Sequence, residues 1–391
     1  MEIELWWLLA LPLFFGLGWL AARIDIRQVV QESRALPRSY LTGLNFLLNE
    51  QQDKAIDAFL EAVRIDPDTV ELHFALGSLF RRRGETDRAI RIHQLLVDRE
   101  YISEEQRLQA LAELGQDFLK AGLLDRAEAV FTRLRGTAAD ALALRNLLEI
   151  YQQEKDWAKA IDVAAALPNH ESVMWRTEVA NFHCELAASL TIDAKPDEAA
   201  QQLDLALEVN PRSVRASLLR GDLLASIGRD EDALAAWKRI ENQNPVYLAL
   251  AAQRIMDASG RLGRLEQGYQ LLRAWLESHP SLDLLDELFH WVMEKQGPKA
   301  AYELVREELR RNPTLLGLDK LLEAALLNAP AEQRSDIELI KQLIHGHTRK
   351  VARYRCDTCG FKARQFHWRC PACGGWETYP PRRTEEFDLT P

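Results

Sequence analysis

The stretch YLTGLNFLLNEQQDKAIDAFLEAVRIDP, Tyr40–Pro67, is the first clear copy of a pattern that recurs along the chain. Gly43 precedes Ala55 by twelve residues, and Phe59 follows Ala55 by four. The small residue recurs at Ala55, Ala89, Ala127, Ala160, Ala199, Ala233, Gly268 and Ala301. The gaps between them are 34, 38, 33, 39, 34, 35 and 33 residues, so this is an internal repeat.

The period is that of tetratricopeptide repeats, in which each unit is a pair of helices. The glycine and alanine positions let the paired helices approach closely, and a proline about twelve residues after the small residue ends the second helix. No unit buries its apolar face alone, so neighbouring units must stack. We therefore predict an all-α array of about eight units over residues 36–314, followed by a capping helical segment over residues 315–347.

An array of this kind binds other molecules and carries no chemistry of its own. The sequence contains no HExxH, P-loop or GxSxG motif, which indicates that the chain is not an enzyme. The first helix of each unit is expected to line a groove that binds peptides or folded partners. Repeat register alone selects the candidate partner-binding residues, although each of these residue types is also common on solvated helix faces: Phe74, Arg81, Arg145, Gln152, Arg215 and Asp222.

The N-terminus carries a segment typical of a membrane anchor. Leu5–Ala22 contains 18 residues without a charge, which as a helix is about 27 Å long, close to the hydrocarbon thickness of a bilayer. A cleaved signal peptide fits less well, because acidic residues precede the run and no small-residue cleavage site follows it. We predict an anchor over residues 1–22 and a linker over residues 23–35. The arginines that follow place the remainder in the cytoplasm.

The charge distribution argues against a generic nucleic-acid binder. The whole chain has a formal net charge of −10. Residues 348–391 carry nine Lys or Arg against five Asp or Glu, a net of +4, so the remaining 347 residues carry −14. The basic segment coincides with four of the five cysteines. Nucleic-acid binding by this segment stays open as an alternative, but the acidic body and the predicted anchor disfavour it.

The C-terminal cysteines form two CxxC motifs, Cys356/Cys359 and Cys370/Cys373, separated by ten residues. A glycine follows each motif and permits a tight turn. Four thiolates suit one zinc or iron ion, and a shell closed by four cysteines is structural rather than catalytic. We predict a metal-binding ribbon over residues 348–380 and a tail over 381–391. Its expected core is Tyr354, Phe361, Phe366, Trp368 and Trp376.

Other roles for the cysteines are weaker. A pair of redox dithiols lacks a thioredoxin-like context. Replacement of one thiolate by His367 is not needed, since four cysteines complete the shell. Electron transfer by bound iron stays open, although nothing else in the chain indicates an electron donor or acceptor. A module this short needs its metal in order to fold.

The combination of an anchor at Leu5–Ala22, the repeat run, and the motifs CDTCG (Cys356–Gly360) and CPACGGW (Cys370–Trp376) resembles the lipopolysaccharide assembly protein B family of Gram-negative bacteria. The resemblance covers nearly the whole chain. It implies a single-pass inner-membrane protein with its C-terminal domain in the cytoplasm. It also implies a rubredoxin-like ribbon that packs against the repeats and cysteines that are required for function.

The resemblance further implies an adaptor for the membrane protease FtsH that promotes degradation of the lipid A deacetylase LpxC. Lipopolysaccharide, or a regulator protein that responds to it, is expected to oppose this activity. A scaffold that gathers lipopolysaccharide synthesis and export proteins would have the same sequence features. The sequence leaves open zinc versus iron, a homo-oligomer, and which surface binds which partner.

Overall fold

The computed structural model describes residues 38–65, 69–167, 173–381 and 384–385. Within these ranges the chain is helical up to a short three-stranded sheet at its C-terminal end, which agrees with the predicted all-α repeat class and terminal ribbon. The predicted anchor (1–22) and linker (23–35) lie outside the described residues. None of the helices inside the described ranges is both long and apolar enough to cross a bilayer.

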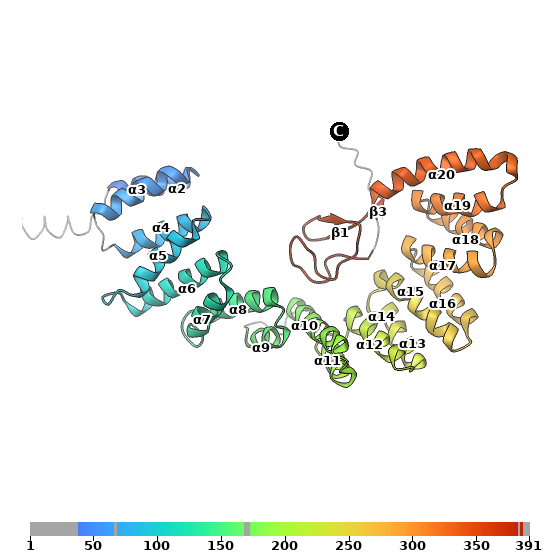
Figure 1. Cartoon of the computed structure of the whole chain (residues 1–391), viewed down its shortest axis with the longest axis horizontal. Helices are drawn as coiled ribbons and strands as arrows, with labels where there is room; N and C mark the ends of the chain where they lie inside the picture. Colours follow the sequence, from blue (N-terminus) through green and yellow to red (C-terminus); the bar gives the residue numbers. More distant parts are fainter. Residues whose placement is uncertain (1–37, 66–68, 168–172, 382–383, 386–391) are drawn as a thin grey trace, which may run out of the picture. The chain divides into compact units, whose positions relative to one another are not determined.

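The helices belong to two compact units, Met1–Ile150 and Tyr151–Pro391. In the first unit, consecutive helices pack as pairs, α2 with α3, α4 with α5 and α6 with α7. This unit ends within α8 (Figure 1). Its helices are α2 (Arg38–Leu48), α3 (Gln52–Ile65), α4 (Val70–Arg82), α5 (Thr86–Val97), α6 (Glu104–Lys120), α7 (Leu124–Arg133) and α8 (Asp140–Glu154).

The second unit continues the pairing and carries the ribbon. Its helices are α9 (Trp157–Ala166), α10 (Val173–Ile192), α11 (Pro196–Val209), α12 (Val214–Ser226), α13 (Asp230–Lys238), α14 (Ile240–Gln243), η1 (Pro245–Tyr247), α15 (Ala249–Arg261), α16 (Leu265–Ser278), α17 (Leu282–Lys295), α18 (Pro298–Arg311), α19 (Leu315–Asn328) and α20 (Ala331–Val351). The ribbon holds β1 (Ala352–Arg355), β2 (Lys362–Ala363) and β3 (Thr384–Glu385), antiparallel in the order β2-β1-β3.

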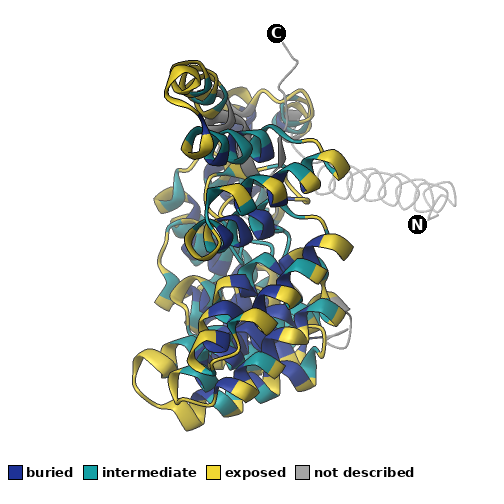
Figure 2. Cartoon of the chain, turned by 90° about the vertical axis from the view of Figure 1, so that its right-hand side faces the viewer, coloured by how far each residue is buried: buried dark blue, intermediate teal, exposed yellow. Residues whose placement is uncertain are grey.

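Close approach within helix pairs depends on glycines that face a ring sixteen residues later. A Cβ on Gly115 would lie 2.6 Å from the ring of Phe131, and one on Gly221 would lie 2.2 Å from Trp237. Gly43 and Gly77 meet Phe59 and His93 in the same way. The repeated glycine and the ring after the repeated alanine are therefore two sides of one contact. Figure 2 shows buried residues where neighbouring helices meet and exposed ones outside.

The turn inside a helix pair needs one residue in the left-handed region. Glycine occupies it where the sequence marks the turn, with φ of +80° at Gly84 and +78° at Gly228. In other units Glu50, Lys155 and Ala194 adopt φ of 58°, 60° and 58° at the corresponding turn. A residue with a Cβ is strained there by roughly 1 kcal/mol or more, so tertiary packing imposes the turn even where glycine is missing.

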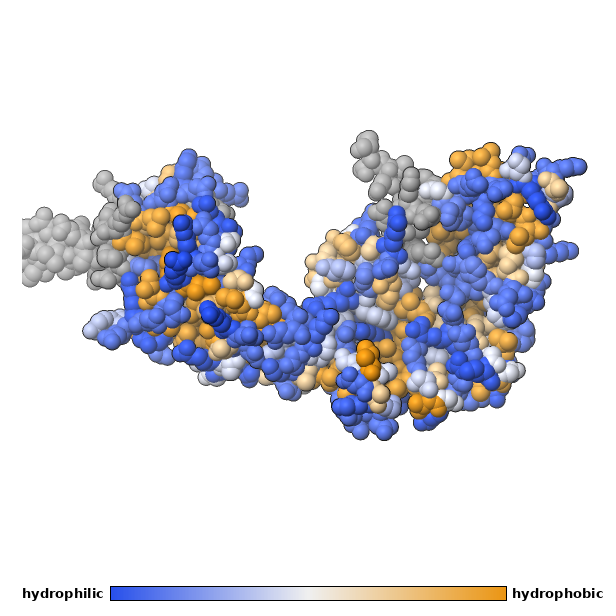
Figure 3. All heavy atoms as spheres, in the orientation of Figure 1, coloured by the Kyte–Doolittle hydropathy of each residue, from blue (hydrophilic) through white to orange (hydrophobic). Residues whose placement is uncertain are grey.

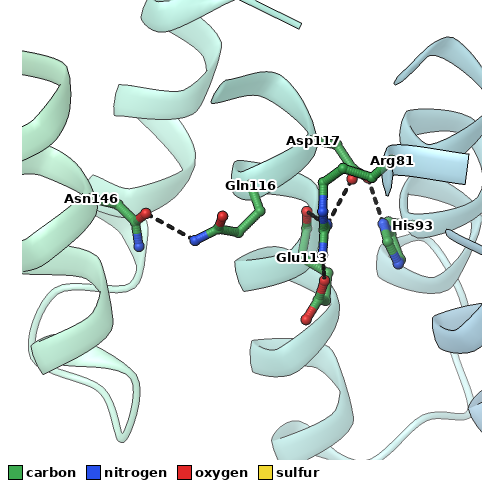
Figure 4. Close-up of polar contacts among 6 residues, drawn as sticks. All are labelled: Arg81, His93, Glu113, Gln116, Asp117 and Asn146. Atoms are coloured by element: carbon green, nitrogen blue, oxygen red, sulfur yellow. Dashed lines mark hydrogen bonds and ion pairs between the residues drawn. The ribbon is translucent and has the colours of Figure 1, made fainter. Parts of the chain in front are cut away.

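A buried polar network links α4, α5 and α6 in the first unit (Figure 4). Asp117 is fully buried and accepts hydrogen bonds from Arg81, at 2.8 Å, and from His93, at 2.5 Å. Arg81 also pairs with the carboxylate of Glu113 at 2.5 Å. Burial opposes the charge of Arg81, but both carboxylates outweigh burial and raise its pKa. The network links one predicted repeat to the next. Its buried charges are tolerated because Arg81 pairs with the carboxylates of Glu113 and Asp117.

The last helix departs from the polar outer surface expected of a cap. α20 packs on α19, yet Leu339 and Leu343 are 59% and 68% exposed, and Leu327 of α19 is 58% exposed. Hydrophobic side chains gather over these two helices at the upper right of Figure 3. Terminal units of repeat arrays usually present a polar outer face. The helical segment after the repeats covers α18, because α19 packs on it. The outer surface of α19 and α20 is nevertheless partly apolar.

The substitution Gly221→Ala tests the close helix contact. The added Cβ would collide with Trp237, which is 1% exposed and donates a hydrogen bond of 3.2 Å to the carbonyl of Leu218. We expect the free energy of unfolding to fall by about 1–3 kcal/mol, measured by chemical denaturation. The control Gly346→Ala lies in α20, where nothing is within 4 Å of the new Cβ, and should be neutral or slightly stabilising. Equal stability of the two variants would contradict the contact.

Candidate metal centre

Four cysteines come together in the ribbon (residues 352–381). The sulfur atoms of Cys356, Cys359, Cys370 and Cys373 all lie within 4.8 Å of one another, and among the described residues this is the one cluster of potential metal donors. The Sγ–Sγ distances are 3.8 Å from Cys356 to Cys373 and 3.7 Å from Cys359 to Cys370. Sulfurs about 2.3 Å from a tetrahedral ion would lie about 3.8 Å apart. The donor set therefore fits one zinc or iron ion.

Each cysteine pair sits in a tight turn with the same backbone hydrogen bonds. In the first knuckle (Cys356–Phe361) the N–H of Gly360 donates to the carbonyl of Cys356 at 2.9 Å. In the second (Cys370–Gly375) Gly374 donates to Cys370 at 2.9 Å. Gly360 and Gly374 have φ of +74° and +71°, a conformation that glycine adopts without strain. The glycines thus act as the sequence predicts.

The two knuckles contribute sulfurs of different exposure. Cys356 and Cys370 are buried, whereas Cys359 and Cys373 are exposed. Burial of Cys356 opposes ionisation, but the hydroxyl of Thr378 and backbone N–H groups of the knuckle outweigh it and lower the pKa of this thiol to about 6. The thiolate is the form that binds metal. A bound ion would cross-link the knuckles without an open coordination position, since four sulfurs complete the shell.

The core beside the cysteines contains two of the five predicted aromatic residues, Tyr354 and Phe366, whereas Trp368 and Trp376 pack against the repeats. Tyr379 is fully buried and packs with Tyr354, Ala363 and Phe366 beside the buried cysteines. The prediction that Phe361 belongs to this core is wrong, because its side chain is 37% exposed. Phe361 lies in the knuckle turn, where its carbonyl accepts a hydrogen bond from the N–H of Cys356. Tyr379 fills the interior in its place.

His367 is not one of the clustered metal donors. Its ring lies 5.8 Å from that of Tyr379 and half-buried against the ribbon core. The metal shell therefore needs no imidazole.

The second knuckle inserts an aromatic side chain between the repeats. Trp376 is 7% exposed, and its ring centroid lies 6.2 Å from those of both Trp157 of α9 and Phe182 of α10. Trp157 and Phe182 stack on each other at 5.7 Å. Aromatic contacts of this edge-to-face kind contribute about 0.5–1.5 kcal/mol beyond area burial. This cluster forms one half of the ribbon seat, the surface of the repeats that the ribbon covers.

The other half of the ribbon seat is Tyr247 of η1. Its ring stacks on Trp368 with a centroid distance of 5.5 Å and an interplanar angle of 6°. Phe366 meets Tyr247 edge-on at 6.3 Å. Phe366 and Trp368 also pack against the large core of α12–α19. The ribbon is therefore continuous with the hydrophobic core of the second unit.

A buried arginine lies between the two aromatic halves. Arg215 of α12 is 8% exposed and forms an ion pair of 2.7 Å with Glu185. Its guanidinium lies 5.7 Å from the ring centroid of Trp368 and 5.4 Å from that of Trp376. It also donates a long hydrogen bond, 3.4 Å, to Asn181. A desolvated guanidinium gains more from such faces than an exposed one does.

Asn181 and Glu377 connect the same seat to the ribbon backbone. The amide of Asn181 donates to the carboxylate of Glu377 at 3.0 Å. Burial raises the pKa of Glu377, while the hydrogen bond from Asn181 and the charge of Arg215 partly counter that shift. Glu377 also adopts φ of +54°, a left-handed conformation. The left-handed backbone and the carboxyl group of raised pKa both belong to Glu377, which contacts α10 through Asn181.

Arg369 attaches the second knuckle to the start of the second unit. It donates to the carbonyl of Gly374 at 3.1 Å and to the side-chain oxygen of Gln152 at 2.8 Å. Its guanidinium lies 5.5 Å from the ring of Trp376. Burial raises the pKa of Glu178 in α10, and the charge of Arg369 counters this shift. The side chain of Arg369 therefore contacts the second knuckle, the ring of Trp376 and the repeats at the same time.

The six candidate partner-binding residues are placed differently from one another. Gln152 and Arg215 contact the ribbon, and Asp222 accepts a hydrogen bond from Arg254 at 2.6 Å. Phe74 is half-buried 6.1 Å from His93, Arg81 belongs to the polar network described above, and Arg145 is exposed. Binding of an external partner by any of them stays a prediction. Two of the six are already engaged by the ribbon of the same chain.

Sequence reasoning did not single out Trp157, Phe182 or Tyr247. Their positions follow no repeat period, because they serve a contact made once in the chain. The available signal was compositional, namely large aromatic residues that the repeat pattern does not account for. That signal alone does not identify the ribbon as the neighbour.

The substitution Arg215→Met should loosen the ribbon from its seat by about 1.5–3 kcal/mol, because it removes a charge-assisted hydrogen bond and leaves Glu185 without this partner. Hydrogen exchange in residues 354–381 would measure the effect. Arg145→Met removes an exposed arginine from α8 and is the matched control. Equal exchange in both variants would contradict the role of Arg215.

Removal of the metal with a chelator, or Cys356→Ser, should unfold the ribbon because modules of this size depend on their ion. Trp376 would become exposed, so we expect a red shift of tryptophan emission and protease cleavage within the ribbon, with the helical signal largely kept. Cys184→Ser is the control, since Cys184 is buried outside the cluster and burial raises its pKa to about 12. Visible absorbance separates iron from zinc. Unchanged emission and protease resistance would contradict a structural ion.

Comparisons with known proteins agree with this architecture. The family description "Rubredoxin metal binding domain" matches residues 354–381, and "Tetratricopeptide repeat" matches residues 40–103, 112–172 and 194–245. Lipopolysaccharide assembly protein B of Escherichia coli (strain K12) is 35% identical over 384 residues, covering 97% of this chain and 98% of the relative. The protein of the same name from Haemophilus influenzae (strain ATCC 51907 / DSM 11121 / KW20 / Rd) is 32% identical over 404 residues, covering 99% and 100%. The chain therefore belongs to the lipopolysaccharide assembly protein B family.

Proposed function

We propose that this chain is a non-enzymatic inner-membrane adaptor that promotes degradation of the deacetylase LpxC by the protease FtsH. The observation that carries the proposal is family membership over nearly the full length, 97% of the chain in the Escherichia coli comparison. The adaptor role itself comes from what the family resemblance implies. An adaptor must hold two proteins together, and stacked helical repeats with an attached ribbon suit that task without catalytic residues.

The ribbon seat supports a structural use of the metal in this role. Trp376, Arg215 and Tyr247 fix the ribbon against four different elements of the second unit. The ion would hold the knuckles in the shape that presents Trp376 and Arg369 to the repeats. The metal then stabilises a binding scaffold and takes no part in a reaction. This use explains why loss of a cysteine would abolish function without loss of any catalytic group.

We further propose an anchor over residues 1–22 that places the described units on the cytoplasmic side of the inner membrane. An anchor would confine this chain to the same membrane as the protease, and this confinement raises the effective concentration of each protein around the other. Weak contacts at the repeats would then suffice for capture.

A scaffold for lipopolysaccharide assembly is the second candidate. The observation that favours it is the name of the relatives, lipopolysaccharide assembly protein B, which refers to assembly. Such a scaffold would hold several synthesis and export proteins together and leave the lifetime of each unchanged. The two functions therefore differ in a measurable quantity.

The lifetime of LpxC in cells separates the two candidates. We expect depletion of this protein to lengthen the half-life of LpxC several-fold, as measured by pulse-chase, and the wild-type chain to restore it. The Gly346→Ala variant, which adds a methyl group in open space, should restore it equally. The deletion of residues 1–22 should fail to restore it. An unchanged half-life on depletion would contradict the adaptor and favour the scaffold.

A further inference from the structure

The last helix, α20, makes polar contacts with α19 along one side. Lys341 lies 3.9 Å from the carboxylate of Glu323, and His345 lies 2.9 Å from that of Asp319. These two contacts show which side of α20 faces the repeats. The side of α20 opposite to them therefore faces away from the array.

The outward side of α20 carries hydrophobic residues at its centre. Leu339 and Leu343 are 59% and 68% exposed, and Ile340 beside them is 47% exposed. Terminal units of repeat arrays usually present a polar outer face, which keeps the array soluble. Three exposed aliphatic side chains on the last helix are therefore expected to be covered by another surface.

The two leucines belong to a row of residues that follow one another in steps of four, three, four, three and four. Such alternating steps are those of the seam of a coiled coil, along which two helices pack. Nothing lies within 4 Å of a Cβ built on Gly346, so the row is open there. All row residues up to Gly346 are exposed, and Lys350 follows by its spacing in the sequence. We name this set the α20 row: Glu332, Asp336, Leu339, Leu343, Gly346 and Lys350.

The α20 row is symmetric about position 341. Positions 339 and 343, 336 and 346, and 332 and 350 each lie equally far from that point. If two copies of α20 pack antiparallel, Leu339 of each copy would therefore meet Leu343 of the other. Glu332 of each copy would likewise face Lys350 of the other. The row is thus complementary to itself.

The charges of α20 favour the antiparallel orientation. Residues 331–340 hold three acidic residues and one basic residue, a net of −2. Residues 341–351 hold three basic residues and no acidic one, a net of +3 with histidine neutral. Two antiparallel copies place opposite charges together, whereas two parallel copies would place like charges together. The acidic half would also face the phosphates of an anionic membrane, which disfavours a lipid surface as the occupant.

We propose that α20 forms the interface of a two-fold symmetric homodimer, in which the α20 rows of two copies pack antiparallel. In such an isologous interface, one patch meets the same patch of the other copy. A contact limited to one helix of each copy is smaller than the roughly 1,600 Å² of a standard interface, so we expect a weak and reversible dimer. The inference goes beyond the proposed function and does not rest on it.

A double leucine substitution tests the centre of the α20 row. Leu339→Glu with Leu343→Glu places carboxylates of both copies at the proposed contact, and both positions are exposed, so each copy should fold normally. We expect Kd for dimerisation to rise about ten-fold or more, because the contact would bury unpaired charges. The matched control is Leu48→Glu with Leu95→Glu, which changes two leucines of the first unit that are 82% and 60% exposed. This control should dimerise as the wild type does.

Two single charge reversals test the orientation of the helices. Glu332→Lys and Lys350→Glu should each raise Kd about three-fold at low salt, because each replaces attractive pairs by repulsive ones. An equal mixture of the two variants should recover the wild-type affinity, since the mixed dimer again has opposite charges at both ends. In a parallel pair like charges already meet, so neither single reversal would weaken it.

The experiment measures dimerisation of the full-length chain in detergent micelles, by sedimentation equilibrium over a range of protein concentrations. Circular dichroism and metal content report that each variant remains folded. A photocrosslinker at position 343, in a mixture of isotopically light and heavy chains, then locates the contact. We expect crosslinks between light and heavy chains that map to residues 339–340.

Each other outcome would overturn the inference. A wild-type chain that stays monomeric at every concentration forms no such dimer, and a dimer that is unchanged in the double leucine variant forms through another surface. With the same photocrosslinker in cells, a crosslink within one chain, to a different protein or to lipid would identify a different occupant of the α20 row. None of these results bears on the proposed function, which the half-life of LpxC tests separately.

Discussion

Burial of the Arg215 guanidinium requires contacts from both the repeats and the ribbon of the second unit. It is almost fully desolvated, so its charge is tolerable only while Glu185 pairs with it and the two indoles cover it. Glu185 belongs to α10, Arg215 to α12 and the indoles to the ribbon. The relative position of these three elements is therefore a condition for burial of one charge: displacement of α10 removes its ion-pair partner, and displacement of the ribbon removes the aromatic rings that cover it. This requirement makes the ribbon part of the second unit.

Because the ribbon packs against the repeats, a metal ion bound in the ribbon would also stabilise helices that lie far away in the sequence. A bound ion would hold the sulfurs that fix the knuckles, and the second knuckle positions Trp376 and Arg369. Trp376 packs in an aromatic cluster with Trp157 and Phe182, while Arg369 donates a hydrogen bond to Gln152 at the C-terminal end of α8, where the second unit begins. A small site at the end of the chain thus supports helices more than two hundred residues earlier, because Gln152 and Arg369 are 217 positions apart. The sequence around either residue does not predict the contact between Gln152 and Arg369.

Prediction from sequence worked where the determinants are local. The spacing of Gly221 and Trp237 repeats in other units and predicts paired helices, because the same contact recurs each time. The CxxC motifs predict clustered sulfurs for a similar reason, since two residues and a glycine define the turn. Left-handed turns at Lys155 and Ala194 could not be predicted, because the residue preference points elsewhere and tertiary packing overrides it. Register selected Gln152 and Arg215 as candidates for binding an external partner, which stays a prediction, but it could not show that the ribbon from the far end of the chain contacts them.

The uneven exposure of the four cysteines has a consequence for how long the ribbon stays in place. Each knuckle contributes one buried and one exposed cysteine, and the exposed residues are Cys359 and Cys373. A chelator or a competing ion would reach a bound ion from this side without first separating the ribbon from the helices. The residence time of the ion would then contribute to the lifetime of the folded ribbon. Supply of metal in the surrounding compartment would set how much of the protein is complete at any moment.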